Sequence, residues 1–196
     1  MFIISIDIGV FNLGIVGATI DKFSIKSIKL CELIDIKSLV EYCDDKRCKL
    51  YHDKCMTDYI NHFIKKYKRW FQRSDLILLE RQPVMGFTNI QELLISSFRD
   101  KIRIQSPRSM HKYFDISHLS YDRRKDFTIK YADKYIGKFR GYVREKRKHD
   151  MADALCLLVY YLKSEKSKHQ VKVREEQEIA NAKPFTDFIE QFRYQE

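Results

Sequence analysis

The sequence predicts an α/β domain over residues 1–162, with a mixed five-stranded sheet in which three antiparallel strands precede two parallel ones, flanked by helices. Three observations predict this fold class. Short apolar runs with strand periodicity occur at five places along the chain. The first three runs are joined by short links, as in an antiparallel meander. Helical stripes then alternate with the last two runs, which is typical of parallel strands joined by crossovers.

The antiparallel part is expected from three consecutive segments. Residues 2–7 form a continuous apolar run, and residues 13–20 form a second strand after a turn rich in Gly and Asn. Residues 24–30 alternate between apolar and polar side chains, as a strand with one solvated face does.

The other two strands are expected at residues 76–80 and 102–105, each preceded by a helix. Apolar residues at helical spacing place these two helices at about 59–71 and 90–98.

Two more helices are expected in the C-terminal half. The first runs from about residue 121 to a stop at Gly137 and is followed by a basic loop. An apolar stripe over residues 151–162 predicts a core helix that closes the domain. Residues 163–196 are mostly charged, and we expect them to form a mobile linker with a short amphipathic end.

The charge of the chain indicates a polyanionic partner. Lys and Arg number 37 against 27 Asp and Glu, a formal net charge of +10. Basic surfaces bind nucleic acids because neutralising phosphates releases counterions. No segment approaches the ~20 apolar residues of a membrane span, and the N-terminus lacks the features of a signal peptide. We therefore expect a DNA or RNA partner, no membrane association and an intracellular location.

Five cysteines, an odd number without an export signal, favour a reducing compartment. Four metal-ligand residues lie in or beside a loop at about 36–54, namely Cys43, Cys48, His52 and Cys55. These are the ligand types of a structural zinc site, although their spacing differs from that of common zinc fingers. The alternative is that Cys48 and His52 make local hydrogen bonds or pack against the following helix.

Four acidic residues lie at the ends of predicted strands or at the start of a predicted helix, and core packing does not explain why they are acidic. Asp7 and Glu80 each end a strand, and Asp150 and Asp153 lie on one face at the start of a helix. Ionised carboxylates are rarely buried unless they are paired or bind a metal. Phosphodiester hydrolysis needs an activated water and a neutralised leaving oxygen, which two divalent cations held by carboxylates supply. We therefore expect these four acids to hold two Mg²⁺ ions, for which Mn²⁺ can substitute.

Taken singly, two of these acids have simpler explanations. Asp150 also fits the cap of a helix, and Glu80 also fits an ion pair with Arg81 or a helix lysine. The combination of four acids in this order favours the metal site.

Three sequence blocks carry a family likeness: Ile6-Asp7-Ile8-Gly9 with Asn12 and Gly14, Leu79-Glu80-Arg81-Gln82-Pro83, and Lys148-His149-Asp150-Met151-Ala152-Asp153. They resemble the RuvC-like Holliday junction resolvases of the ribonuclease H superfamily. The resolvases of poxviruses and other large DNA viruses are more similar than the yeast mitochondrial enzyme. The resemblance spans about residues 2–162, and the last two blocks are specific only in combination.

The resemblance implies a ribonuclease H-like fold and a homodimeric, Mg²⁺-dependent endonuclease that makes paired nicks in four-way DNA junctions. It carries the metal ligands of the family onto Asp7, Glu80, Asp150 and Asp153. It also implies a basic residue near the scissile phosphate, for which we choose Lys125 over Arg124; a solvated helix charge is the alternative for Lys125. A viral enzyme of this type would act in the host cytoplasm or a virus factory.

Phosphate contacts are expected from basic residues around the acidic ones: Arg81, Arg108, Lys112, Arg123, Arg124, Arg144, Arg147 and Lys148. Phe87, in the loop after Gly86, is expected to stack or wedge at the junction centre. The alternative for Phe87 is a plug in the core.

Other functions have to be weighed against a resolvase. Another nuclease of this fold, acting on RNA–DNA hybrids or as an integrase-like strand transferase, would use the same metal site. A non-catalytic junction-binding module is disfavoured because clustered carboxylates beside phosphate weaken binding. A sugar kinase or actin-like ATPase would need a second lobe with another glycine-rich phosphate loop, which the sequence lacks.

Overall fold

The computed structural model describes the backbone of residues 1–193 and the side chains of residues 1–179. The chain divides into two units, residues 1–161 and 162–196. The first unit contains a five-stranded sheet with the strand order β3-β2-β1-β4-β5, so that the first strand is central. The strands are β1 (Phe2–Asp7), β2 (Leu13–Asp21), β3 (Ser24–Ile34), β4 (Leu76–Glu80) and β5 (Ile102–Gln105).

The sheet is mixed, as the sequence predicts. Strands β1, β2 and β3 pair antiparallel, whereas β4 pairs parallel to β1 and β5 pairs parallel to β4. Parallel pairing requires crossover connections, and the helices before β4 and β5 supply them.

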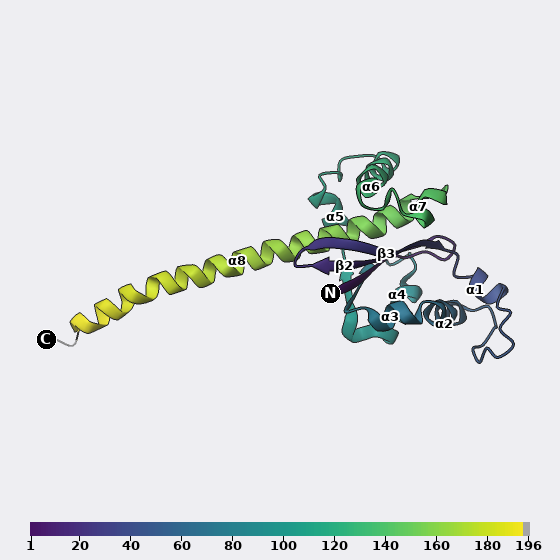
Figure 1. The fold of residues 1–196 in the computed structure, drawn as a ribbon, viewed down its shortest axis with the longest axis horizontal. Coiled ribbons are helices and arrows are strands. Elements are labelled where there is room, and N and C mark those ends of the chain that lie inside the picture. Colours follow the sequence, from purple (N-terminus) through teal and green to yellow (C-terminus); the bar gives the residue numbers. More distant parts are fainter. Residues whose placement is uncertain (194–196) are drawn as a thin grey trace. The chain divides into compact units, whose positions relative to one another are not determined.

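One face of the sheet is covered by the helices of these crossovers, which lie below the strands in Figure 1. They are α2 (Met56–Lys66), α3 (Lys68–Arg73) and α4 (Thr88–Phe98), the last continued by a 3₁₀ turn at Arg99–Lys101. Ile4 and Ile6 of β1 point to this face and belong to the same core as Phe63, Phe71 and Leu94 of the helices. Because strand side chains alternate with a period of two, this core uses every second residue of β1.

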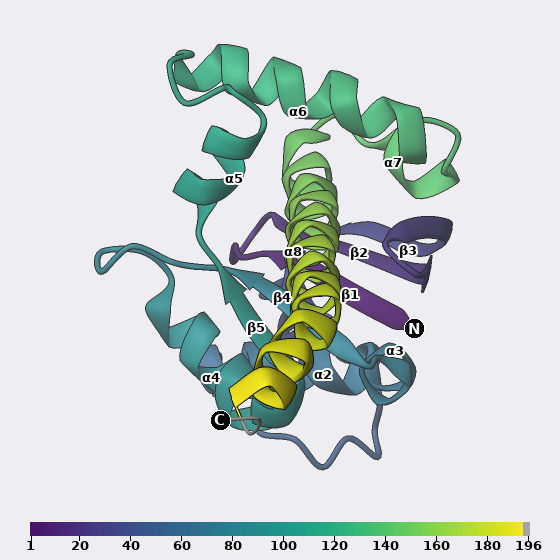
Figure 2. The same cartoon turned by 90° about the vertical axis from the view of Figure 1, so that its left-hand side faces the viewer.

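The other elements lie on the opposite side of the sheet (Figure 2). They are α5 (Pro107–Tyr113), α6 (Tyr121–Ile136), α7 (Arg140–Arg144) and the first turns of α8 (His149–Arg193). Met151, Leu155 and Leu158 of α8 are buried, and the Met151 sulfur lies 3.7 Å from the Cys31 sulfur of β3. The apolar stripe predicted for this helix therefore packs against the sheet.

Gly14 of β2 permits the close approach of α8 to the sheet. A Cβ atom at this position would collide with the main-chain carbonyl group of Asp150 and lie 2.8 Å from the Met151 nitrogen. Gly14 is also the ladder partner of Asp7. The missing side chain at Gly14 therefore lets the start of α8 lie beside the end of β1.

The expected strands are present, and the structure differs from the sequence prediction in detail. Strand β3 continues to Ile34, and the helix expected over 59–71 is divided at Tyr67, whose φ of −99° and ψ of 15° lie outside the helical range. Helices α5, α7 and α1 (Ser38–Glu41) were not expected. Each has seven residues or fewer, too few to produce a clear helical period.

We expected residues 163–196 to form a linker without regular secondary structure. This expectation is wrong, because α8 continues to Arg193. This segment is rich in Lys, Glu and Gln, which have high helix propensity. Pairs one turn apart support the helix, with Lys168 Nζ 2.7 Å from Glu165 Oε1. The expected amphipathic end falls on residues whose side chains lie outside the described part of the chain.

Among the described residues, no helix combines the length and the apolar character needed to cross a lipid bilayer.

Candidate active site

Asp7 and Glu80 end two neighbouring parallel strands. The residues before them, Ile6 and Leu79, are partners in the β1–β4 ladder, so both acids lie at the same edge of the sheet. Their side chains are hydrogen-bonded to each other. Because an ionised carboxylate can only accept, one of the two must carry a proton when this bond is made.

Asp150 lies in the first turn of α8 and Asp153 follows it three residues later, and the close approach at Gly14 brings this end of the helix to the same edge. Asp150 is buried and accepts two hydrogen bonds from Arg147, at 2.6 Å from Nε and 3.3 Å from Nη2. Asp153 is hydrogen-bonded by the Thr128 hydroxyl of α6.

The four carboxylates line one cavity of about 280 Å³. The rest of the lining comes mainly from α5 and α6 and from the start of α8: Ile8, His111, Tyr121, Arg124, Lys125, Thr128 and His149. The structure therefore brings together all four predicted metal ligands and both candidates for the basic residue. The lining thus combines the four acidic side chains with the basic side chains of Arg124 and Lys125.

Burial and mutual repulsion perturb the acids. Burial raises the pKa of Asp7 well above its usual range, and the charges of Glu80, Asp153 and Asp150 raise it further. Burial is also the main cause that raises the pKa of Asp153 to about 7. The cluster therefore retains protons near neutral pH unless a cation compensates the negative charge.

These residues fit a site for divalent metal ions. Carboxylate oxygens are the hard ligands that Mg²⁺ and Mn²⁺ prefer. A divalent cation offsets the repulsion that raises the carboxyl pKa values of Asp7 and Asp153.

Lys125 is held at the cavity wall by two neighbours. Its Nζ lies 3.0 Å from His149 Nε2 and 4.1 Å from the centroid of the Tyr121 ring. Burial lowers the pKa of His149, so that its neutral imidazole accepts a hydrogen bond from the lysine ammonium. The guanidinium of Arg124, by contrast, donates to the Leu119 carbonyl at 2.7 Å. This difference favours Lys125 as the basic residue that faces a phosphate.

Five residues of the cavity lining were not predicted as site residues: Ile8, His111, Tyr121, Thr128 and His149. His111 comes from α5, a helix too short to show a helical period, and its pKa is lowered mainly by burial and further by Arg124. Thr128 lies one turn after Lys125, and its hydroxyl carries a single hydrogen, which it can donate either to Asp153 or to the Lys125 carbonyl oxygen 3.1 Å away. The spacing from Lys125 to Thr128 in a predicted helix was the signal that could have identified the threonine.

Of the predicted DNA-binding residues, Arg124 lines the cavity. Arg147 is engaged by Asp150, and Lys148 Nζ lies 5.2 Å from the centroid of the Tyr142 ring. Phe87 is 42% exposed at the start of α4, which argues against the core-plugging alternative. The remaining basic residues are exposed and free to contact solvent or a ligand: Arg81, Arg108, Lys112, Arg123 and Arg144.

Three of the four residues predicted as zinc ligands come together in the structure, and a different residue takes the place of the fourth. Cys43, Cys48 and His52 come together with His62 of α2, and the predicted Cys55 is not in the group. Cys55 instead caps α2, and its backbone N–H donates to the Asp58 carboxylate at 3.5 Å. His62 escaped prediction because it is buried among the apolar residues of the helix.

The sequence matches no family model and no curated protein sequence. The structure, however, is similar to solved structures of resolvases. The fowlpox virus resolvase in complex with Holliday junction DNA has a TM-score of 0.61 and 18% identity, covering 84% of this chain and 98% of that chain. RuvC of Thermus thermophilus has a TM-score of 0.53 and 12% identity, covering 85% of this chain and 97% of that chain.

The yeast mitochondrial Holliday junction resolvase, Ydc2, has a TM-score of 0.53 and 16% identity, covering 82% of this chain and 78% of that chain. All three similarities extend over most of the chain. The chain therefore has the ribonuclease H-like fold of the RuvC-like Holliday junction resolvases, as its sequence blocks predict.

Proposed function

We propose that this protein is a divalent-metal-dependent endonuclease that resolves four-way DNA junctions by paired nicks. The observation that carries the proposal is the meeting of four carboxylates in one cavity that is also lined by the basic side chains of Arg124 and Lys125. The proteins of similar fold support it, since each of those named above is a Holliday junction resolvase.

Asp7, Glu80, Asp150 and Asp153 are the residues that would hold the metal ions, which we propose to be two Mg²⁺. Bound there, such ions supply an activated water and neutralise the leaving oxygen. The negative charge of the four carboxylates otherwise repels a phosphodiester, so in the metal-free state the cavity is a poor site for DNA.

Lys125 would pair with a non-bridging oxygen of the scissile phosphate. Its ammonium is directed into the cavity by Tyr121 and His149, both of which also line it. A positive charge placed before the reaction stabilises the charge that develops at the phosphate. His111, whose imidazole is neutral at neutral pH, lies in the same cavity and is placed to take up or release a proton.

A homodimer follows from the proposed reaction. Each chain carries one acidic cavity of this kind in the part that the structure describes, and paired nicks require two sites acting on one junction. The exposed basic residues around the cavity would contact the phosphates of the junction arms. Sedimentation of the protein with and without a junction measures this stoichiometry.

The test is cleavage of three labelled substrates, with and without Mg²⁺. They are a four-way junction, a linear duplex of matched sequence and an RNA–DNA hybrid. We expect metal-dependent, paired nicks in the junction alone. Cleavage of the hybrid instead would be consistent with the metal site, but would show that the protein is a different nuclease of this fold. Tight junction binding without cleavage of any substrate would show that the protein is a non-catalytic binding module.

A variant pair tests the role of Lys125 in the same assay. Lys125→Met should reduce the rate of the chemical step by about 10²-fold or more, the usual loss for a group that stabilises charge in the transition state. Lys130→Met, at an exposed position of the same helix, is the matched control and should cleave normally. Equal cleavage rates for the two variants would show that Lys125 does not contribute to catalysis.

A further inference from the structure

A second group of metal-ligand side chains lies outside the acidic cavity, in the loop between α1 and α2. We propose that Cys43, Cys48, His52 and His62 bind a zinc ion that fastens this loop to helix α2. The loop from Tyr42 to Cys55 contains neither helix nor strand, whereas His62 is in the second turn of α2.

The four side chains converge closely enough to share one ion. Their ligand atoms all lie within 4.8 Å of one another. Two thiolates and two imidazoles are the soft and borderline ligands of structural zinc sites, whereas Mg²⁺ prefers the oxygen ligands of the acidic cavity. Four protein ligands also complete a tetrahedral shell, as in sites that are structural rather than catalytic.

Two separations match the edges of such a tetrahedron. Bonds of about 2.3 Å from zinc to sulfur and about 2.05 Å to nitrogen give edges of roughly 3.6 Å between sulfur and nitrogen and roughly 3.3 Å between two nitrogens. Cys48 Sγ lies 3.7 Å from His62 Nε2, and the Nε2 atoms of His52 and His62 are 3.1 Å apart. The side chains therefore need to move only slightly to coordinate an ion.

The hydrogen bonding of His62 prepares it as a ligand. Its Nδ1 lies 2.8 Å from the main-chain carbonyl oxygen of Asp58, which can only accept, so Nδ1 carries the hydrogen. In the neutral ring, Nε2 then presents its lone pair toward Cys48 and His52. Histidine ligands of metals commonly donate their other ring N–H to a carbonyl in this way. His62 is only 4% exposed, so its orientation is fixed by packing as well.

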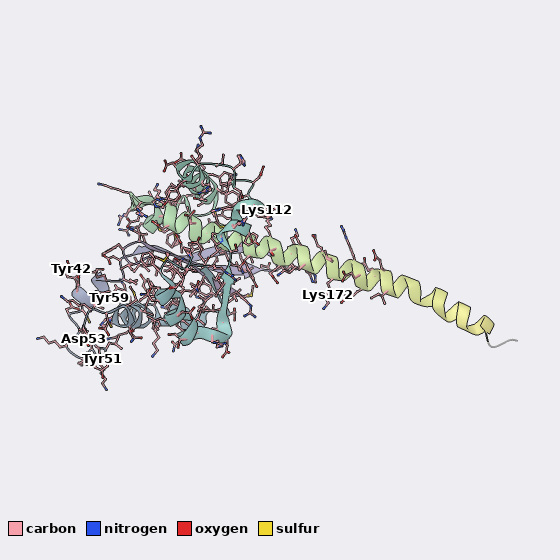
Figure 3. All side chains as sticks on the ribbon, turned by 180° about the vertical axis from the view of Figure 1, so that it is seen from behind. Tyr42, Tyr51, Asp53, Tyr59, Lys112 and Lys172 are labelled. Carbon is pink, nitrogen blue, oxygen red and sulfur yellow. The ribbon has the colours of Figure 1, made fainter. Side chains whose placement is uncertain are left out.

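The surroundings explain why the loop needs such a site. Tyr42 and Tyr51 are 80% and 77% exposed and, with Asp53, are labelled along the outside of the loop in Figure 3. Aromatic side chains that would otherwise anchor the loop in the core therefore point away from it. Lys65 Nζ lies 3.1 Å from Cys48 Sγ, and this positive charge favours the thiolate that zinc requires.

Metal binding by the full chain tests the proposal directly. The protein is purified under reducing conditions, stripped with a chelator and titrated with Zn²⁺ or Co²⁺, and its metal content is measured by elemental mass spectrometry. We expect one tightly bound ion per chain and, for Co²⁺, the visible absorption of a tetrahedral site with thiolate ligands. Zinc should displace the cobalt and abolish this absorption.

Three variants identify the ligands. Cys48→Ser and His62→Gln should lose the tight ion and the thiolate–cobalt absorption. Cys55→Ser is the matched control, since Cys55 is an exposed cysteine at the end of the same loop and is not a member of the group, and should keep both. Loss of the ion from Cys55→Ser alone, or retention of the full absorption by Cys48→Ser, would overturn the assignment.

Thiol protection provides a readout on the unaltered protein, in case a variant fails to fold. Zinc should slow alkylation of Cys43 and Cys48 by at least tenfold, measured by peptide mass spectrometry, and leave the exposed Cys55 unchanged. Equal alkylation rates with and without zinc would contradict the proposal, as would a Cys43–Cys48 disulfide in zinc-free protein kept under reducing conditions. Junction cleavage with Mg²⁺ does not depend on these outcomes, so the two proposals are tested separately.

Discussion

The buried carboxylates of the cavity should destabilise the metal-free protein above neutral pH, and the substitution Asp153→Asn should relieve part of this cost. The pKa of Asp153 is raised from an ordinary value of 3.8 to about 7, mainly by burial. Because the folded-state pKa lies above that of the unfolded chain, the folded protein keeps a proton that the unfolded chain has released. The stability of the metal-free protein therefore falls as the pH rises from about 4 to about 7, and stays lowered above it.

The size of the effect follows from the pKa. At about 1.4 kcal/mol per pKa unit, a difference of roughly three units corresponds to roughly 4 kcal/mol at pH 8. The amide of Asn must also be desolvated, at a cost of about 1–3 kcal/mol if it is imperfectly hydrogen-bonded. We expect a net gain of about 1–3 kcal/mol in the free energy of unfolding at pH 8, which is about 2–10 °C in Tm for a chain of this size. At pH 4 we expect little gain, because Asp153 is then largely protonated in the folded state.

Thermal unfolding in the presence of a chelator, followed by circular dichroism between pH 4 and pH 8, measures this gain. Asp126→Asn, at an exposed position of α6, is the matched control and should follow the wild-type protein. Mg²⁺ should raise the Tm of the wild-type protein and narrow its difference from Asp153→Asn. A variant that is no more stable than the wild type at pH 8, or that gains as much at pH 4, would refute the reasoning.

Three further changes test how the site is built. Gly14→Ala should lower the cleavage rate by about tenfold or more and destabilise the protein by about 1–3 kcal/mol, because the added methyl group collides with the Asp150 carbonyl; normal kinetics and normal denaturant unfolding would show that α8 tolerates displacement. Arg147→Gln should lower the Mg²⁺ concentration needed for half-maximal cleavage, because the guanidinium competes for Asp150, and an unchanged Mg²⁺ titration would exclude this competition. Phe87→Ala should weaken junction binding and reduce the unstacking of bases, which a fluorescent base at the branch point measures. If neither quantity changes, Phe87 does not act as a wedge at the junction centre.

The sequence was sufficient for the features that depend on local pattern. Apolar runs identified the five strands, and short links distinguished the antiparallel part from the crossovers. Asp7 and Glu80 could be placed together because parallel strands that neighbour each other end at the same edge. The spacing of three residues likewise placed Asp150 and Asp153 on one face of the helix that they begin.

The features that the sequence did not predict depend on contacts between distant segments. His111 reaches the cavity from a helix of seven residues, too short to show a period. His62 looked like one more member of an amphipathic helix, and only the folded loop shows that its ring faces two cysteines and a histidine. The pairing of Arg147 with Asp150 was also hidden, because an arginine in a basic loop is equally suited to a phosphate.

The central claim is tested most directly by measuring binding and cleavage of one four-way junction by the wild-type protein and by Asp7→Asn. With Mg²⁺, the wild-type protein should make paired nicks. Asp7→Asn should make none, yet bind the junction at least as tightly, because the substitution removes a negative charge from the cavity that faces DNA. Nicking by Asp7→Asn at the wild-type rate would contradict both the metal site and the proposed function.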